Sequence, residues 1–351
     1  MPPPTPPLHY PIPLYQGHQC ACKTTTATEL MKQKSTNPVL RRLLCMMVGA
    51  SIVTTSMAAT TREVNQNDPY APYQTVGAAV TDALPGDTIL VHPGTYLERV
   101  TISGITLKSL KGPEVTVIQS PDGTGDGVTL TGNQNVTLQG FRVQGYVRGI
   151  VVNASAGATK VGNCIATGNS ADGLYLGLDM PLSAKIVNNI TADNGGAGLM
   201  VAQRGPNIQF SSVFNNIAYR NGSYGFEVDV DYGNWNDTFG DYNCAYGNTK
   251  GAFSHGSTAG AHGITTDPLV NATAHYRFNS QSSPCVNTGN PSSFYSDPDG
   301  SRCDMGAYGS PDAANWWRDP FTGPAVLNVT IDPPQVRPGS NIVIRATART
   351  E

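Results

Sequence analysis

The sequence has few charged residues: Asp, Glu, Lys and Arg make up 13% of its 351 residues, against about 25% in typical soluble domains. This scarcity excludes long charged helices and coiled coils, which are built largely from these residue types. The 22 basic residues do not outnumber the 25 acidic ones, so the basic face that follows nucleic-acid phosphates cannot form. We therefore expect no nucleic-acid partner.

The sequence also lacks an apolar run long enough to cross a bilayer, which takes about 20 residues. Its longest such run, residues 43–53, follows basic residues and precedes the small-residue sequence Ser56-Met57-Ala58. This order is typical of a cleaved secretory signal, although an amphipathic helix of the folded domain also fits. We predict a signal peptide at 31–58, a proline-rich stretch at 1–30 that precedes the true start, and a secreted, periplasmic or cell-surface mature chain without a membrane span.

Glycine and proline are abundant instead, with 38 and 26 residues, which favours many short strands joined by turns. Glycines followed by alternating apolar residues recur at intervals of 22, 24, 25 and 27 residues. The glycines of this repeat are Gly127, Gly149, Gly173, Gly198 and Gly225. A second column keeps the same register and consists of Asn169, Asn194, Asn221 and Asn248. Two columns in one register indicate a repeat architecture.

A period near 25 that holds strands of three to five residues excludes a helical solenoid. Such strands bury their apolar face by stacking on their own copies, as in a parallel β-helix. Between the two columns lie residues that we expect to face inward: Ile165, Ile190, Ile217 and Cys244. A third column, Asn189, Asn216 and Asn243, fits either an amide ladder between coils or a row of exposed turns.

Upstream of the repeat, Val76, Ala79, Val80 and Ala83 follow helical spacing, which ends at Pro85-Gly86. We predict a short helix that caps the N-terminal end of an all-β solenoid, because a stack of coils needs a cover at its end.

The sequence of residues 84–96, Leu-Pro-Gly-Asp-Thr-Ile-Leu-Val-His-Pro-Gly-Thr-Tyr, resembles the first coil of secreted right-handed parallel β-helix proteins of the pectin-lyase-like superfamily. Residues 283–289 and 297–309 resemble the closing segment of the same proteins, and the resemblance extends over residues 70–312. It implies the fold far more than an activity, because this architecture carries lyases, hydrolases, epimerases and adhesins. The basic motif of pectate lyases and the Asp pair with Gly-His-Gly of polygalacturonases are both missing.

The outward face of the repeat strands holds the candidate chemistry. Alternation places Glu227, Asp229 and Asp231 on one face, about 6.5 to 7 Å apart, with Arg204 one coil away. This spacing suits a hard-cation site, the acid and base of an inverting glycoside hydrolase, or a solvated face with no chemistry. Arg204 could bind a uronate carboxylate or help to remove a proton from a uronan. The candidate sugar-binding residues are Tyr175, Asp179, Tyr232 and Trp235.

The closing segment offers a second candidate site. Asp297, Asp299 and Asp304 surround a Gly turn, which suits calcium but lacks the full EF-hand ligand set, and a Pro-Asp-Gly turn needs no metal. Cys285 and Cys303 bracket this loop in a chain expected to reach an oxidising compartment, so we predict a disulfide between them.

We therefore expect a parallel β-helix at residues 60–315, then a linker and the start of a β-sandwich-like module at 316–351. The two strands of this module either continue beyond this chain or dock on the β-helix. The predicted function is binding or display against polysaccharide by a monomer or part of a longer multidomain chain. The alternative is a polysaccharide lyase or glycoside hydrolase that acts on uronic-acid-containing glycans.

Overall fold

The structure of the protein is a computed structural model that describes residues 58–154, 158–177, 184–202, 212–228, 239–254 and 257–317, and the backbone of two strands beyond them. The predicted signal peptide and the residues before it lie outside these ranges. Within the described residues, no helix has the length and apolar character needed to cross a membrane.

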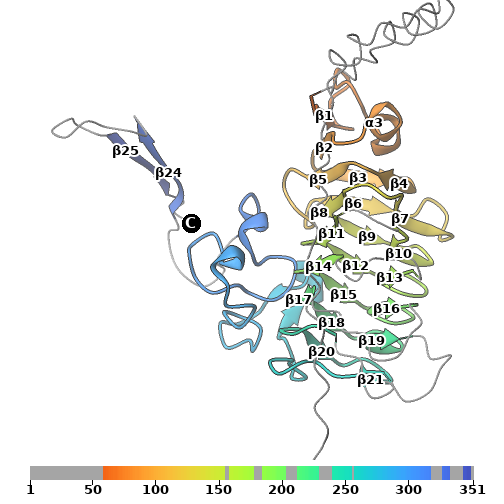
Figure 1. Ribbon diagram of the computed structural model, residues 1–351, viewed down its shortest axis with the longest axis vertical. Coiled ribbons are helices and arrows are strands. Elements are labelled where there is room, and N and C mark those ends of the chain that lie inside the picture. The colour runs from red at the N-terminus through yellow and green to blue at the C-terminus, as the bar shows by residue number, and fades with distance from the viewer. Residues whose placement is uncertain are drawn as a thin grey trace, which may run out of the picture. The chain divides into compact units, whose positions relative to one another are not determined.

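Three parallel sheets of seven strands each form the body of the protein (Figure 1). The first sheet contains β1 (Thr61–Val64), β2 (Thr88–Val91), β5 (Thr106–Ser109), β8 (Val136–Gln139), β11 (Thr159–Gly162), β14 (Lys185–Val187) and β17 (Val213–Phe214). The second contains β3 (Gly94–Leu97), β6 (Thr116–Gln119), β9 (Arg142–Gln144), β12 (Ile165–Thr167), β15 (Ile190–Ala192), β18 (Ile217–Tyr219) and β20 (Cys244–Tyr246). The third contains β4 (Val100–Ser103), β7 (Asp126–Thr131), β10 (Arg148–Val152), β13 (Leu174–Leu176), β16 (Leu199–Val201), β19 (Tyr224–Val228) and β21 (Gly251–Phe253).

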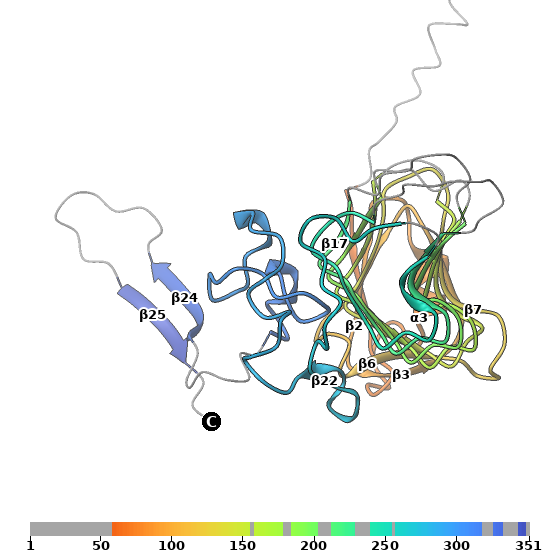
Figure 2. The same ribbon diagram turned by 90° about the horizontal axis from the view of Figure 1, so that it is seen from below.

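Each coil contributes one strand to each sheet, and every strand pairs with its copies in the neighbouring coils (Figure 2). The repeat glycines lie at the start of the third-sheet strands, next to the asparagine column. A Cβ atom on Gly173 would lie 2.6 Å from Nδ2 of Asn194 and 2.9 Å from the carbonyl oxygen of Gly198. Glycine is therefore required here because the next coil leaves no room for a side chain. The predicted fold class, an all-β right-handed parallel β-helix, is confirmed.

Both asparagine columns form amide ladders inside the coils. In one column, Nδ2 of Asn194 donates to Oδ1 of Asn221 (2.9 Å), and Asn221 donates in turn to Asn248 (2.8 Å). In the other, Nδ2 of Asn189 donates to Asn216 (3.0 Å). The ladder alternative is therefore correct for the column that begins at Asn189, and the column that begins at Asn169 forms a ladder as well.

The N-terminal helix α3 (Val76–Asp82) begins at Thr75, whose side chain accepts a hydrogen bond from the amide of Ala78. Its Val76 and Ala79 are buried in the same core cluster as the first coils. Both carboxylate oxygens of Glu98 accept hydrogen bonds from the first free amides of this helix, those of Val76 (2.8 Å) and Gly77 (2.7 Å). The predicted capping helix is thus present and attached to the β4 end of the first coil.

The C-terminal segment, residues 257–317, runs along the outside of the second sheet. It contains the antiparallel pair β22 (Val270–Asn271) and β23 (Arg277–Phe278) and the 3-10 turns Ala272–Ala274, Ser293–Tyr295 and Pro311–Ala313. Three asparagines of the coils, each with left-handed backbone, bind this segment through hydrogen bonds. Nδ2 of Asn163 donates to the carbonyl of Gly309 (2.7 Å), and Nδ2 of Asn188 donates to the carbonyl of Asp304 (2.9 Å). The backbone carbonyl of Asn215 accepts from the amide of Gly306 (2.7 Å). Beyond it, β24 (Val326–Asp332) and β25 (Val343–Ala348) form an antiparallel pair.

One orientation predicted from the sequence is wrong. Ile165 pairs with Arg142, whereas Ala166 pairs with the core residue Val143, so Ile165 faces outward. The isoleucine column belongs to a second buried cluster, formed with residues of the C-terminal segment, and consists of Ile165, Ile190, Ile217 and Cys244. These side chains are apolar because the C-terminal segment covers them, and the inner core below them is formed by smaller residues such as Ala218 and Ala245.

Candidate functional site

The outer face of the third sheet gathers charged and aromatic side chains from successive coils. Strand pairing aligns one outward column across β7, β10, β13, β16 and β19, and its members are Thr129, Val151, Tyr175, Met200 and Glu227. A second column consists of the residues that precede the repeat glycines, among them Asp126, Arg148 and Asp172. We call Asp126, Arg148, Asp172, Tyr175 and Glu227 together the outer-face cluster.

Arg148 is fixed in place by a bidentate ion pair within this cluster. Its Nε and Nη2 each donate to a carboxylate oxygen of Asp126, at 2.8 Å in both cases. Its guanidinium lies 4.4 Å from the ring centroid of Tyr175 on the next coil. The hydrogen bonds to Asp126 raise the pKa of Arg148, which keeps it positively charged. A planar cation stacked on an aromatic ring is a rigid, flat and charged surface.

Two carboxyl groups lie further along the same face. Burial and the neighbouring Glu227 raise the pKa of Asp172, which is opposed by a 2.8 Å hydrogen bond from the amide of Ala197 to its Oδ1. Glu227 accepts a hydrogen bond from the hydroxyl of Ser223 (2.5 Å). The Asp172 carboxyl is therefore biased toward its acid form.

The structure brings together only part of the predicted site. Tyr175 and Glu227 lie on the same outer face, as expected. The other candidates fall outside the described residues: Asp179, Arg204, Asp229, Asp231, Tyr232 and Trp235. Sequence reasoning missed Asp126, Arg148 and Asp172, each of which directly precedes a repeat glycine.

The predicted calcium ligands each stabilise a separate part of the backbone. Asp297 accepts from the amides of Asp304 (2.9 Å) and Ser310 (2.6 Å), and Asp299 accepts from that of Ser301 (2.8 Å). Burial, followed by the charge of Asp304, raises the pKa of Asp297 to about 8. The described ranges hold no group of three or more His, Cys, Asp or Glu side chains arranged to bind a metal ion. Calcium at Asp297, Asp299 and Asp304 stays a prediction for titration to test.

The structure has Cys285 and Cys303, like Cys164 and Cys244, as free thiols, so the Cys285–Cys303 disulfide stays a prediction. The backbone carbonyl of Cys285 accepts from the amide of Met305 (2.9 Å), and the backbone carbonyl of Cys303 accepts from the amide of Gly289 (2.8 Å). The two cysteines therefore do not lie opposite each other. Sγ of Cys303 instead accepts hydrogen bonds from the side-chain amides of Asn188 (3.4 Å) and Asn215 (3.3 Å).

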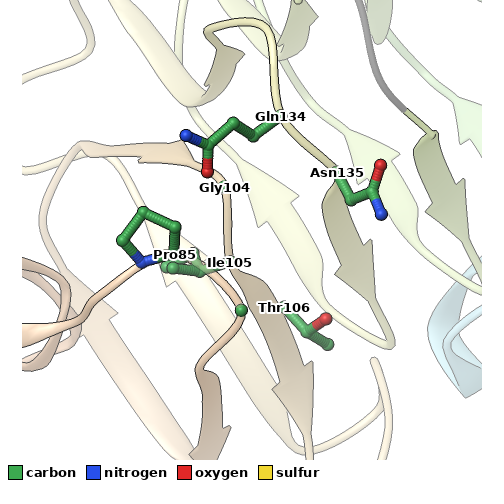
Figure 3. A pocket seen from close by; sticks show the side chains of 7 residues that line it. Pro85, Gly104, Ile105, Thr106, Gln134 and Asn135 are labelled. Atoms are coloured by element: carbon green, nitrogen blue, oxygen red, sulfur yellow. The ribbon is translucent and has the colours of Figure 1, made fainter. Parts of the chain in front are cut away.

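A separate hollow opens between the first coils (Figure 3). It is lined by Pro85, Gly86, Gly104, Ile105, Thr106, Gln134 and Asn135. None of these residues is charged or aromatic, and Oδ1 of Asn135 already accepts a hydrogen bond from the amide of Ala158 (2.8 Å). The outer-face cluster is therefore the better candidate for a functional site.

Comparison with known proteins identifies one matching family. The family described as "Periplasmic copper-binding protein (NosD)" matches residues 81–261, more than half of the 351 residues. No curated protein sequence matches the chain significantly.

Among solved structures, the pectate lyase Pel9A is 15% identical over 73% of this chain and 98% of its own, with a TM-score of 0.41. The pectin methylesterase from Aspergillus niger is 12% identical over 63% of this chain and 94% of its own, with a TM-score of 0.31. The pectin methylesterase PemA from Erwinia chrysanthemi is 11% identical over 60% of this chain and 81% of its own, with a TM-score of 0.26. None of these similarities is high enough to bear on activity.

Proposed function

The chain belongs to the NosD family of periplasmic proteins, and from this premise and the outer-face cluster we propose that it is an exported β-helix protein that binds polysaccharide. The periplasmic description of the family agrees with the export expected from the sequence. Binding, with or without display at the cell surface, is the function that the outer face of the third sheet supports best.

The observation that carries this proposal is the stacking of Arg148 on Tyr175. Sugars present flat, weakly apolar faces together with hydroxyl and carboxylate oxygens, and a cation held against an aromatic ring complements both. Asp126 occupies Nε and Nη2 of Arg148, which leaves the two N–H groups of Nη1 for oxygens of a ligand. A uronic-acid carboxylate is therefore the preferred partner of this position.

The repeat extends this recognition along the axis of the β-helix. Coils follow one another at about 4.8 Å, so a linear polymer that lies across the third sheet meets a new set of side chains on each coil. In order along the sheet it would meet Arg148, then Tyr175, and then Glu227 beside Met200. An extended glycan fits this arrangement better than a small molecule, because the contacting side chains recur from coil to coil along the sheet.

The described residues do not fit the copper that the family description names. His92 is paired with Glu63 through Nε2 (3.0 Å), and Nδ1 of His262 is paired with Asp241 (2.7 Å). Nδ1 of His275 faces Nη1 of Arg142 at 2.7 Å, which excludes a second cation there. Without a ligand set in the described ranges, we assign copper no part in the proposed function.

A second candidate function, hydrolysis of the bound glycan, is favoured by Asp172 and Glu227. Glycosidases need one carboxyl that is protonated, and burial together with the nearby Glu227 raises the pKa of Asp172 in the direction of that role. The two residues lie two coils apart on the same face, and the charge of Glu227 acts on Asp172. Lyase action with Arg204, Asp229 and Asp231 remains a proposal from the sequence.

Replacing Tyr175 by alanine is expected to weaken glycan binding at least tenfold, because it removes the ring that supports Arg148. Isothermal titration of the full chain with oligogalacturonate, oligoalginate and a neutral xylan measures the effect. Reducing-end release in the same samples would identify hydrolysis, whereas its absence with retained affinity leaves binding as the function.

The matched control is Tyr246→Ala, which removes a tyrosine from the second sheet that is 39% exposed and stacks on Tyr219. We expect it to bind glycan like the unaltered protein. Equal affinity of both variants, or no binding of the unaltered chain to any of the three glycans, would contradict the proposal.

A further inference from the structure

Cys244 lies at the end of the outward isoleucine column, beneath the C-terminal segment. Strand pairing sets it beside Ile217 of the preceding coil, and both side chains are fully buried in the second cluster. Its thiol therefore does not face the inner core of the coils. It faces residues that arrive more than 20 positions later in the chain.

Hydrogen bonds of the backbone bring Cys285 to the same place. Its carbonyl accepts from the amide of Met305 (2.9 Å), and the adjacent Gly306 lies directly on the isoleucine column. A Cβ atom on Gly306 would be 2.9 Å from Cδ1 of Ile217, the residue next to Cys244. Cys285 belongs to the same buried cluster as Cys244. The neighbouring Cys244 thiol, together with burial, raises the pKa of the Cys285 thiol.

The other two described cysteines are held elsewhere. Cys164 is buried in the inner core, where its thiol donates to the carbonyl of Gly162 (3.3 Å). The thiol of Cys303 donates to the carbonyl of Asp304 (3.1 Å) and lies against two asparagine amides. Cys244 and Cys285 are thus the two described cysteines that share one buried cluster.

We propose that Cys244 and Cys285 are joined by a disulfide in the exported protein, a modification that fastens the C-terminal segment to the last coils of the β-helix. The export compartment is one in which neighbouring thiols are oxidised. The bond would close a loop of 41 residue positions, counted from 285 minus 244. This inference does not depend on glycan binding.

The oxidant is a protein disulfide of the thiol–disulfide exchange class. The thiolate of one cysteine attacks a sulfur of the donor disulfide, forming a mixed disulfide and releasing one donor thiolate. The second cysteine thiolate then displaces the other donor sulfur, so the substrate loses two protons and two electrons and the donor becomes a dithiol. Because both cysteines are buried in the folded chain, the exchange precedes docking of the C-terminal segment.

Peptide mapping of the full chain, exported to the periplasm and purified without reductant, tests the pairing. The protein is denatured in the presence of iodoacetamide and digested with trypsin, which cleaves after Lys250, Arg277 and Arg302 and so separates Cys244, Cys285 and Cys303. We expect one disulfide-linked peptide pair that contains Cys244 and Cys285, with Cys164 and Cys303 alkylated. A Cys285–Cys303 link, or alkylation of all four cysteines, would overturn the proposal.

Reductant provides a second readout that does not depend on the map. A disulfide that closes a loop of this length stabilises the folded protein, and its reduction is expected to lower the Tm by about 10 °C. We expect this shift in the unaltered chain and in the matched variant Cys303→Ala, which removes an equally buried thiol. Cys244→Ala and Cys285→Ala should show no shift. A reductant shift that vanishes in Cys303→Ala, or that is absent from the unaltered chain, would contradict the assignment.

Discussion

Replacing Asn216 by alanine is expected to lower the free energy of unfolding by about 4 kcal/mol or more. Nδ2 of Asn216 donates to Oδ1 of Asn243 (3.1 Å) and to the carbonyl of Ile186 (2.8 Å). Its Oδ1 accepts from the amide and the side chain of Asn189, both at 3.0 Å. Each buried group left without a partner costs about 1 to 3 kcal/mol, and several are orphaned at once. Urea unfolding followed by circular dichroism measures the loss.

The matched control for this change is Asn133→Ala, because Asn133 lies in an exposed turn between coils. We expect it to change stability by less than about 0.5 kcal/mol. If both variants unfolded at the same urea concentration, the amide ladder would not stabilise the coils and the asparagine columns would mark turns only.

Replacing Ile217 by aspartate is expected to release the C-terminal segment while the coils stay folded. Ile217 is fully buried in the second cluster, so the variant would leave an unpaired charge beneath the segment. Burying that charge costs several kcal/mol of folding free energy, and release of the C-terminal segment exposes the charge to water and removes this cost. Limited trypsin digestion should then cut at Arg277, which is otherwise held by Glu114 (2.7 Å), while the far-UV spectrum retains its strand signal.

Thr101→Asp is the comparison for this variant, since Thr101 also faces outward from a strand but is exposed. It should resist trypsin like the unaltered protein. Loss of the strand signal in Ile217→Asp would mean that this residue supports the inner core, as the sequence suggested, and not the docking of the C-terminal segment.

The repeat was readable from the sequence because the close approach of neighbouring coils restricts certain positions to one residue type. Gly173 and Asn194 recur in register since the glycine leaves room for the amide of the next coil. The direction of the isoleucine column was not readable. Alternation shows that two sets of residues face opposite ways, but an outward set is apolar too when a distant segment covers it. Ile165 and Met305 are 140 positions apart, and no local pattern links them.

The candidate site was only half predictable for a related reason. Glu227 and Tyr175 were found by counting outward from the repeat glycine, which works where a strand alternates regularly. Arg148 and Asp172 precede the glycine at the corner of the coil, where alternation breaks and periodicity does not predict direction. The predicted Cys285–Cys303 pairing rested on closeness in sequence, whereas the cysteine that shares a buried cluster with Cys285 is Cys244.

Carboxyl footprinting is the measurement that tests the central claim, glycan binding on the outer face of the third sheet, most directly. The chain is labelled with carbodiimide and glycine ethyl ester, with and without saturating glycan, and the modified residues are quantified by mass spectrometry. We predict that glycan protects Asp172 and Glu227 but leaves Glu63 unchanged, because Glu63 is 58% exposed on the first sheet. Unchanged labelling of Asp172 and Glu227, or equal protection of Glu63, would contradict the claim.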